Sequence, residues 1–170
     1  MGNFQHTDIP IKYPLAKETI TEVEIQNLIE WLKDYPRLTK GELTVEFEKE
    51  WAKYIGTKYS VFVNSGSSAN LLMVYALKEL GKLNGKVIVP SVGWVTTISP
   101  LIQFGIEPVM VDADKKTFGI DLEQTEFLLK TEEISAIIFV QVLGVPHYKK
   151  ELLRLSEKYN VPLIEDACAS

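Results

Sequence analysis

Apolar residues in the first third of the chain recur at helical spacing in two separate stretches. One stretch begins with a capping-box pattern at Thr21 and continues at intervals of three and four until Pro36. The other starts near Glu42 and ends at Gly56, a residue type that commonly terminates helices. The pattern therefore predicts two helices separated by the loop Thr39–Gly41.

Short apolar runs alternate with amphipathic stretches through the rest of the chain. The runs are rich in Val and Ile and show little polar alternation, as strands buried on both faces do. This order predicts an α/β fold, a mostly parallel sheet with covering helices. The predicted strands are 60–63, 87–89, 108–111, 136–140 and 162–164, and the predicted helices are 67–80, 94–104, 122–130 and 149–159.

Residues 1–18 contain Pro10 and Pro14 and predict an extended N-terminal arm, with one folded domain from residue 19 to 170.

The composition of the chain narrows the classes of function that it could have. The 170-residue chain has 18 basic and 23 acidic residues and no basic cluster, which argues against nucleic-acid binding. One cysteine, Cys168, and two histidines argue against a disulfide or a metal site. With no secretory pattern and no apolar run near the ~20 residues of a membrane span, we expect a cytoplasmic protein.

Polar positions follow four of the predicted strands, where parallel sheets bind their ligands. The segment Asn64–Asn70 opens a helix with glycine and serine, which suits either a phosphate at the helix N-terminus or an ordinary serine cap. Trp94 is either a platform for a planar cofactor, with hydroxyls from Thr96 and Thr97, or a core residue. These alternatives stay open on sequence alone.

The two later strand ends carry an amide and a carboxylate. Gln141 suits either a ligand contact or a turn cap. Asp166 suits either an ion pair with a protonated ring nitrogen or a helix cap. His147 is interpreted as a solvated or capping residue rather than a base, and Cys168, which has no activating base nearby, as structural.

In order and spacing, these motifs resemble the N-terminal part of the DegT/DnrJ/StrS family of pyridoxal-phosphate enzymes, which act on nucleotide-linked keto sugars. The resemblance runs from about Tyr13 to Ser170. It implies the large domain of a fold type I, aspartate aminotransferase-like enzyme, with its C-terminal part and the small domain absent. The matching segments are 64–70, 93–97, 109–112 with 120–121, 141–146 and 165–167.

The resemblance also implies a site for pyridoxal or pyridoxamine 5'-phosphate. Gly66, Ser67 and Ser68 would hold the phosphate, and Trp94 would stack on the pyridine ring. Asp166 would pair with the ring nitrogen and keep it protonated, so that the ring acts as an electron sink. Gln141 would lie near the cofactor, and Thr39 and Gly41 are candidates for substrate contact.

Two departures from the family pattern accompany the resemblance. Ala169 stands where relatives commonly have a polar residue near the phenolic oxygen of the cofactor. The Schiff-base lysine, or the histidine that replaces it in the dehydratases, would lie beyond Ser170, so no catalytic residue is named within this chain.

The activity implied first is that of an aminotransferase acting on a nucleotide-linked 4-keto or 3-keto deoxysugar. Its amino donor would be an amino acid such as glutamate, and it would work as a homodimer. The alternative is a nucleotide-sugar 3-dehydratase of the same family, which segments 64–72 and 93–97 especially resemble. A second alternative is a truncated, catalytically inert fragment.

Overall fold

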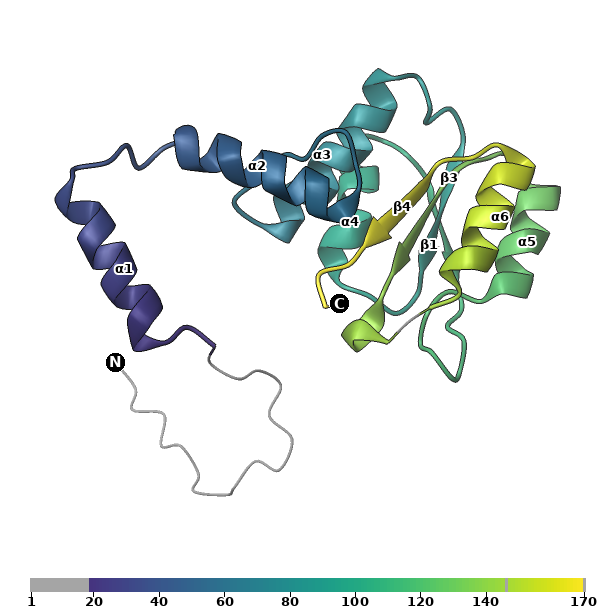
Figure 1. Cartoon of the computed structure of the whole chain (residues 1–170). Helices are drawn as coiled ribbons and strands as arrows, with labels where there is room; N and C mark the ends of the chain where they lie inside the picture. Colours follow the sequence, from purple (N-terminus) through teal and green to yellow (C-terminus); the bar gives the residue numbers. More distant parts are fainter. Residues whose placement is uncertain (1–18, 146, 170) are drawn as a thin grey trace, which may run out of the picture. The chain divides into compact units, whose positions relative to one another are not determined.

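A computed structural model describes residues 19–145 and 147–169, which form two units (Figure 1). One unit reaches to Phe62 and the other starts at Val63. The predicted arm over residues 1–18 lies outside the described residues. No helix in the described residues is both long and apolar enough for a membrane crossing. Nor do three or more His, Cys, Asp or Glu side chains of those residues gather as they would around a metal ion.

The first unit contains the two amphipathic helices that the sequence predicts, α1 (Glu22–Lys33) and α2 (Glu42–Ile55). The capping box at the start of α1 is present, and the backbone N–H of Thr21 donates to the Glu24 carboxylate at 2.7 Å. Helix α2 ends at Gly56, whose φ of +80° lies in the left-handed region that glycine adopts without strain. Both helix predictions are confirmed.

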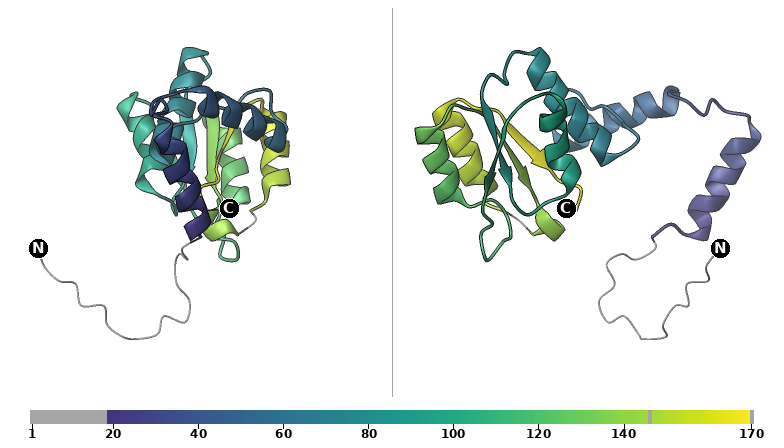
Figure 2. Two further views of the ribbon diagram at one scale, coloured as in Figure 1. Left: turned by 60° about the vertical axis from the view of Figure 1, so that its left-hand side comes forward. Right: turned by 180° about the vertical axis from the view of Figure 1, so that it is seen from behind.

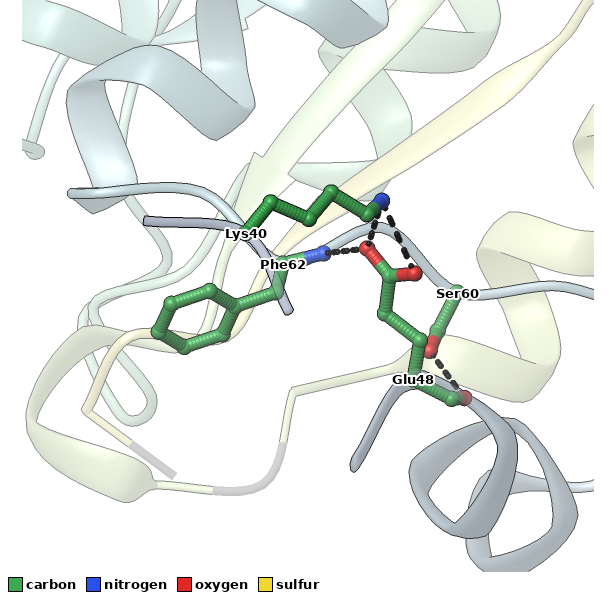
Figure 3. A network of polar contacts seen from close by, with 4 residues as sticks. All are labelled: Lys40, Glu48, Ser60 and Phe62. Carbon is green, nitrogen blue, oxygen red and sulfur yellow. Dashed lines mark hydrogen bonds and ion pairs between the residues drawn. The ribbon is translucent and has the colours of Figure 1, made fainter. Parts of the chain in front are cut away.

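The predicted strand at residues 60–63 is wrong, because these residues are irregular. Figure 3 shows what holds the segment: the Phe62 N–H donates to Oε1 of Glu48 at 3.0 Å, and the Ser60 hydroxyl donates to the Glu48 carbonyl at 2.5 Å. Lys40 pairs with the same carboxylate at 3.0 Å. The Phe62 N–H, followed by Lys40, lowers the pKa of Glu48. A strand needs a neighbouring strand for its backbone groups, whereas here one of those groups, the Phe62 N–H, bonds to a side chain of α2.

The second unit is a four-stranded parallel sheet in the order β2-β1-β3-β4, with helices on both faces (Figures 1 and 2). Its remaining strands and helices agree with the predicted ones to within a few residues, so the α/β fold class is confirmed. The elements are α3 (Gly66–Glu79), β1 (Lys86–Pro90), α4 (Val95–Gln103), β2 (Pro108–Val111), α5 (Leu122–Thr131), β3 (Ile134–Val140), the short helix η1 (Val142–Gly144), α6 (Lys149–Tyr159) and β4 (Leu163–Asp166).

Successive strand residues enter two separate cores, one on each face of the sheet. Val89 and Ile138 pack under α3 and α4, whereas Ile88 and Phe139 pack under α5 and α6. Helix α4 therefore follows β1 on one face, and α6 follows β3 on the other. Neighbouring strands whose helices leave on opposite faces mark the crevice where open α/β sheets bind ligands. That crevice lies at the carboxyl ends of β1 and β3, next to the end of β4.

His147 is buried, with 7 % of its surface exposed, so its interpretation as a solvated residue is wrong. The Thr117 hydroxyl lies 3.2 Å from Nδ1 of the ring. Gly119 leaves room for this ring, because a Cβ at that position would come within 2.0 Å of Nδ1. Burial lowers the pKa of His147 below 6.5, and the opposing charges of Asp114 and Glu151 do not offset it.

The lowered pKa of His147 predicts that stability falls as the pH drops below about 6.5. The unfolded chain then binds a proton that the folded chain resists. Urea unfolding measures this effect. Between pH 7 and pH 5, the free energy of unfolding is expected to fall less for His147→Asn than for the wild-type chain. The pKa of Glu126 is held at about 2, first by Lys158, so this carboxylate titrates in a separate, more acidic range. Parallel pH profiles for the two proteins would contradict the prediction.

Candidate functional site

Asp166 lies at the carboxyl end of β4 and is 9 % exposed. Its Oδ2 accepts hydrogen bonds from Nδ2 of Asn70 and from the Thr97 hydroxyl, both at 2.9 Å. The backbone N–H of Cys168 lies 3.4 Å from Oδ1. Residues from α3, α4 and the end of the sheet thus converge on one carboxylate. No helix among the described residues begins at Asp166, and its interpretation as a helix cap stays a prediction.

The Asp166 carboxylate has no cationic side chain within ion-pair distance in the described part of the chain. The partners of this carboxylate are a neutral amide, a hydroxyl, and the N–H and thiol of Cys168. A buried charge costs free energy unless an opposite charge or good hydrogen bonds compensate it. A cation placed beside Oδ1 would therefore interact favourably with this site.

Asn70 and Thr97 were not predicted as partners of Asp166, although both lie in segments that the sequence singles out. Each stands one helical turn before a buried apolar residue, Asn70 before Val74 and Thr97 before Leu101. A polar residue on the core-facing side of a helix is a signal that it has a buried partner. That spacing was the available clue, but the sequence could not say which carboxylate the partner was.

Cys168 lies two residues after Asp166, and its side chain is exposed. Partial burial, followed by the negative charge of Asp166, raises the pKa of the thiol above its usual 9.0. Because only the thiolate reacts, the structure favours a thiol of low reactivity. The interpretation of Cys168 as a structural residue stays a prediction.

Replacing Asp166 with asparagine is expected to speed alkylation of Cys168 by iodoacetamide at pH 8, by roughly two- to fivefold. The substitution removes the charge that raises the pKa of the thiol. Cys168 is the only cysteine in the sequence, so the alkylated mass reports this thiol alone. An unchanged alkylation rate would mean that the charge of Asp166 does not raise the pKa of the Cys168 thiol.

At the N-terminus of α3, some hydrogen-bond donors are engaged in the helix cap and others are open. Ser65 caps the helix by accepting from the Ser68 N–H at 3.2 Å, and the Ser68 hydroxyl donates to Oδ1 of Asn64 at 2.6 Å. Within the described chain, the N–H groups of Gly66 and Ser67 have no hydrogen-bond partner. A Cβ on Gly66 would meet nothing within 4 Å. Open donors at a helix N-terminus are suited to an anion, whereas Ser68 is engaged in the cap.

Trp94 is the N-cap residue of α4 and is 71 % exposed. Its interpretation as a core residue is therefore wrong, and the indole face is accessible to a ligand. Thr97, predicted to supply a hydroxyl to a cofactor, instead donates that hydroxyl to Asp166. Thr96 is half-buried and makes no such bond.

Gln141 follows β3, and its amide nitrogen donates to the carboxylate of Glu165. The other oxygen of Glu165 pairs with Lys149 of α6 at 2.5 Å. Consecutive strand residues point to opposite faces, so Glu165 and Asp166 lie on different sides of the sheet. No side-chain hydrogen bond joins Gln141 to Asp166 in the described structure, and its role near a cofactor stays a prediction.

Thr39 and Gly41 belong to the first unit. Arg37 donates from Nε to the Thr39 hydroxyl at 2.7 Å. A cavity of about 650 Å³ is lined by both predicted substrate residues together with Trp31 and Arg37. These residues therefore share one pocket that combines a cation, the carboxylate of Glu42, a hydroxyl and an aromatic ring.

Comparison with known proteins identifies the chain as part of a known family. The model of the DegT/DnrJ/EryC1/StrS aminotransferase family matches residues 18–170. GDP-4-keto-6-deoxy-D-mannose 3-dehydratase of Yersinia pseudotuberculosis is 42 % identical over 166 residues, which cover 95 % of this chain and 42 % of that protein. The same-named enzyme of Escherichia coli O55:H7 is 38 % identical over 164 residues, covering 94 % and 42 %.

Solved structures give the same result. A GDP-4-keto-6-deoxymannose-3-dehydratase with a trapped PLP-glutamate geminal diamine is similar with a TM-score of 0.81 and 36 % identity, over 93 % of this chain and 42 % of that one. An aminotransferase from Psychrobacter cryohalolentis is similar with a TM-score of 0.75 and 27 % identity, over 86 % and 37 %. The chain thus spans about two-fifths of the length of these relatives. It belongs to the DegT/DnrJ/EryC1/StrS aminotransferase family.

Proposed function

We propose that this chain is part of a pyridoxal-phosphate-dependent enzyme that removes the 3-hydroxyl group from a nucleotide-linked 4-keto-6-deoxysugar. The observation that carries the proposal is the buried Asp166 carboxylate, which has neutral partners and no cation beside it. Similarity favours dehydration over the aminotransferase activity expected first. The two dehydratases are 42 % and 38 % identical to the chain, and the Psychrobacter aminotransferase is 27 % identical.

The residues of the second unit fit such a cofactor. Asp166 offers a carboxylate to a protonated ring nitrogen, and the open N–H groups of Gly66 and Ser67 offer donors to a phosphate. Trp94 offers an exposed indole face for stacking. When bound, pyridoxamine phosphate would supply an amine for the keto carbon of the sugar and an electron sink that assists release of the 3-hydroxyl group. The task of Asp166 would be to hold the proton on the ring nitrogen.

Ser68 and Gln141 are proposed to contribute less to cofactor binding than the residues above. Ser68 would support the phosphate segment through its bonds to Ser65 and Asn64. Gln141 has its amide nitrogen engaged by Glu165, so its carboxamide oxygen is the atom that would meet a ligand donor.

Product analysis tests the proposed reaction. The whole enzyme of which this chain is proposed to be part would be incubated with GDP-4-keto-6-deoxy-D-mannose, pyridoxamine phosphate and glutamate, and the sugar nucleotide would be followed by mass spectrometry. A product that has lost one oxygen atom would support the dehydratase. Exchange of the keto oxygen for an amino group would support the aminotransferase instead. An unchanged sugar with bound cofactor would contradict both activities.

Thr39→Ala is expected to weaken binding of GDP about fivefold and to leave the affinity for pyridoxamine phosphate unchanged. The Thr39 hydroxyl lies in the pocket with Arg37, where an anionic nucleotide would find a positive charge. Isothermal titration calorimetry with each ligand measures both constants. An equal loss of both affinities would show that Thr39 supports the fold rather than the substrate.

A further inference from the structure

We propose that Asn70 and Thr97 are positioning residues that hold Oδ2 of Asp166 and thereby present Oδ1 to the ring nitrogen of the cofactor. The inference rests on the proposed function, because it takes the ligand of Asp166 to be a protonated ring. It assigns distinct tasks to the two carboxylate oxygens.

The geometry of the three side chains carries the argument. Both donors bind the same oxygen at the same distance, 2.9 Å. They come from two different helices, and both are buried, with 7 % of Asn70 and 1 % of Thr97 exposed. The carboxylate cannot rotate without breaking both bonds and leaving two buried donors unpaired, which would cost about 1–3 kcal/mol for each. The carboxylate plane is therefore fixed before any ligand arrives.

Oδ1 is left with capacity for a stronger partner. The contacts that Cys168 makes with the carboxylate are weak: its N–H lies 3.4 Å from Oδ1, beyond the usual range of a good N–H···O bond, and its thiol is a weak donor. A carboxylate oxygen accepts two hydrogen bonds readily, so Oδ1 has room for a further donor. The donors on Oδ2 orient that vacant acceptor position.

The neutrality of the two donors matters as much as their geometry. A lysine or arginine at either position would also orient the carboxylate, but it would form an ion pair and cancel the charge. An amide and a hydroxyl fix the group and leave its negative charge for the ligand. Neutral, buried and convergent donors are the arrangement that a carboxylate needs to stabilise a ligand cation.

The experiment compares two ligands in the 170-residue chain. One is pyridoxamine phosphate, and the other is its 1-deaza analogue, in which carbon replaces the ring nitrogen. Calorimetry is expected to show that Thr97→Val weakens pyridoxamine phosphate about tenfold and leaves the deaza analogue unchanged. Thr97→Ser, which keeps the hydroxyl, is expected to restore binding to within about twofold. Thr125→Val is the matched control, because Thr125 is also fully buried on a helix of the second unit and its hydroxyl donates to the Asp121 carbonyl instead of Asp166.

Asn70→Ala is the second variant. It is expected to lower the preference of the chain for pyridoxamine phosphate over the deaza analogue. Equal loss of both ligands in Thr97→Val and Asn70→Ala would overturn the inference, because it would mark these side chains as structural. Unchanged binding of pyridoxamine phosphate in both variants would also overturn it. If the wild-type chain itself bound both ligands equally, or bound neither, that result would contradict the proposed pairing of Asp166 with the ring nitrogen. The inference rests on this pairing and would be overturned with it.

Discussion

Asp166→Asn is expected to weaken binding of pyridoxamine phosphate about 100-fold, or ~2.7 kcal/mol, without unfolding the chain. The amide oxygen of asparagine can still accept from Asn70 and Thr97, so the buried donors keep their partner. What disappears is the negative charge that no described cation compensates. Stability should therefore stay equal or rise. Calorimetry and urea unfolding measure the two effects on the same sample.

Glu165→Gln is the matched control for the Asp166 variant. Glu165 is the neighbouring carboxylate on the same strand, but its charge pairs with Lys149 on the other face of the sheet. Its substitution should leave cofactor affinity within about twofold of wild type. A large drop in the stability of Asp166→Asn would contradict the prediction, since it would make the carboxylate a structural group. So would equal affinity losses in the two variants.

The opposite signs expected for binding and stability follow from where Asp166 lies. A charge held by neutral dipoles in a buried position disfavours the ligand-free fold and favours a cationic ligand. Functional groups often lower stability in this way, and removing them commonly stabilises a protein. A gain in stability together with a loss of affinity would be difficult to explain by general damage to the fold.

The sequence predicted the sheet well because its two central strands, β1 and β3, are buried on both faces. Uninterrupted apolar runs such as those ending at Val89 and Val140 leave little choice of structure, and the helices between them carry one apolar side. The segment at residues 60–63 has the same composition, yet it is irregular. Apolar composition permits a strand, but the backbone groups need a neighbouring strand. The sequence does not say whether one is present.

The candidate site was predictable in outline but not in its bonds. The position of Asp166 at a strand end and the glycine and serine before α3 indicated where ligands bind. The contacts of Asn70 and Thr97 with Asp166 join residues 96 and 69 positions apart. No local pattern encodes such distances. His147 was misjudged for the same reason, because the space for its ring is provided by Gly119, which comes from a different loop.

Gly66→Ala is expected to weaken binding of pyridoxamine phosphate by about 10- to 100-fold while leaving thermal stability unchanged or slightly higher. A methyl group on this residue meets no atom of the chain within 4 Å, so the fold has no reason to resist it. It would occupy the space through which a phosphate reaches the open N–H groups of Gly66 and Ser67. Alanine is also the better helix former.

Two comparisons make the Gly66 result specific to the phosphate. Pyridoxamine without its phosphate should bind the wild-type and Gly66→Ala chains equally, because the methyl group blocks only the phosphate. Ser67→Ala removes a hydroxyl but keeps the backbone N–H, so its loss should be smaller, about two- to fivefold. If Gly66→Ala weakened both ligands alike, the methyl group would be disturbing the ring site instead. If it weakened neither, the N-terminus of α3 would not be the phosphate site, and the anchor of the cofactor would have to lie elsewhere.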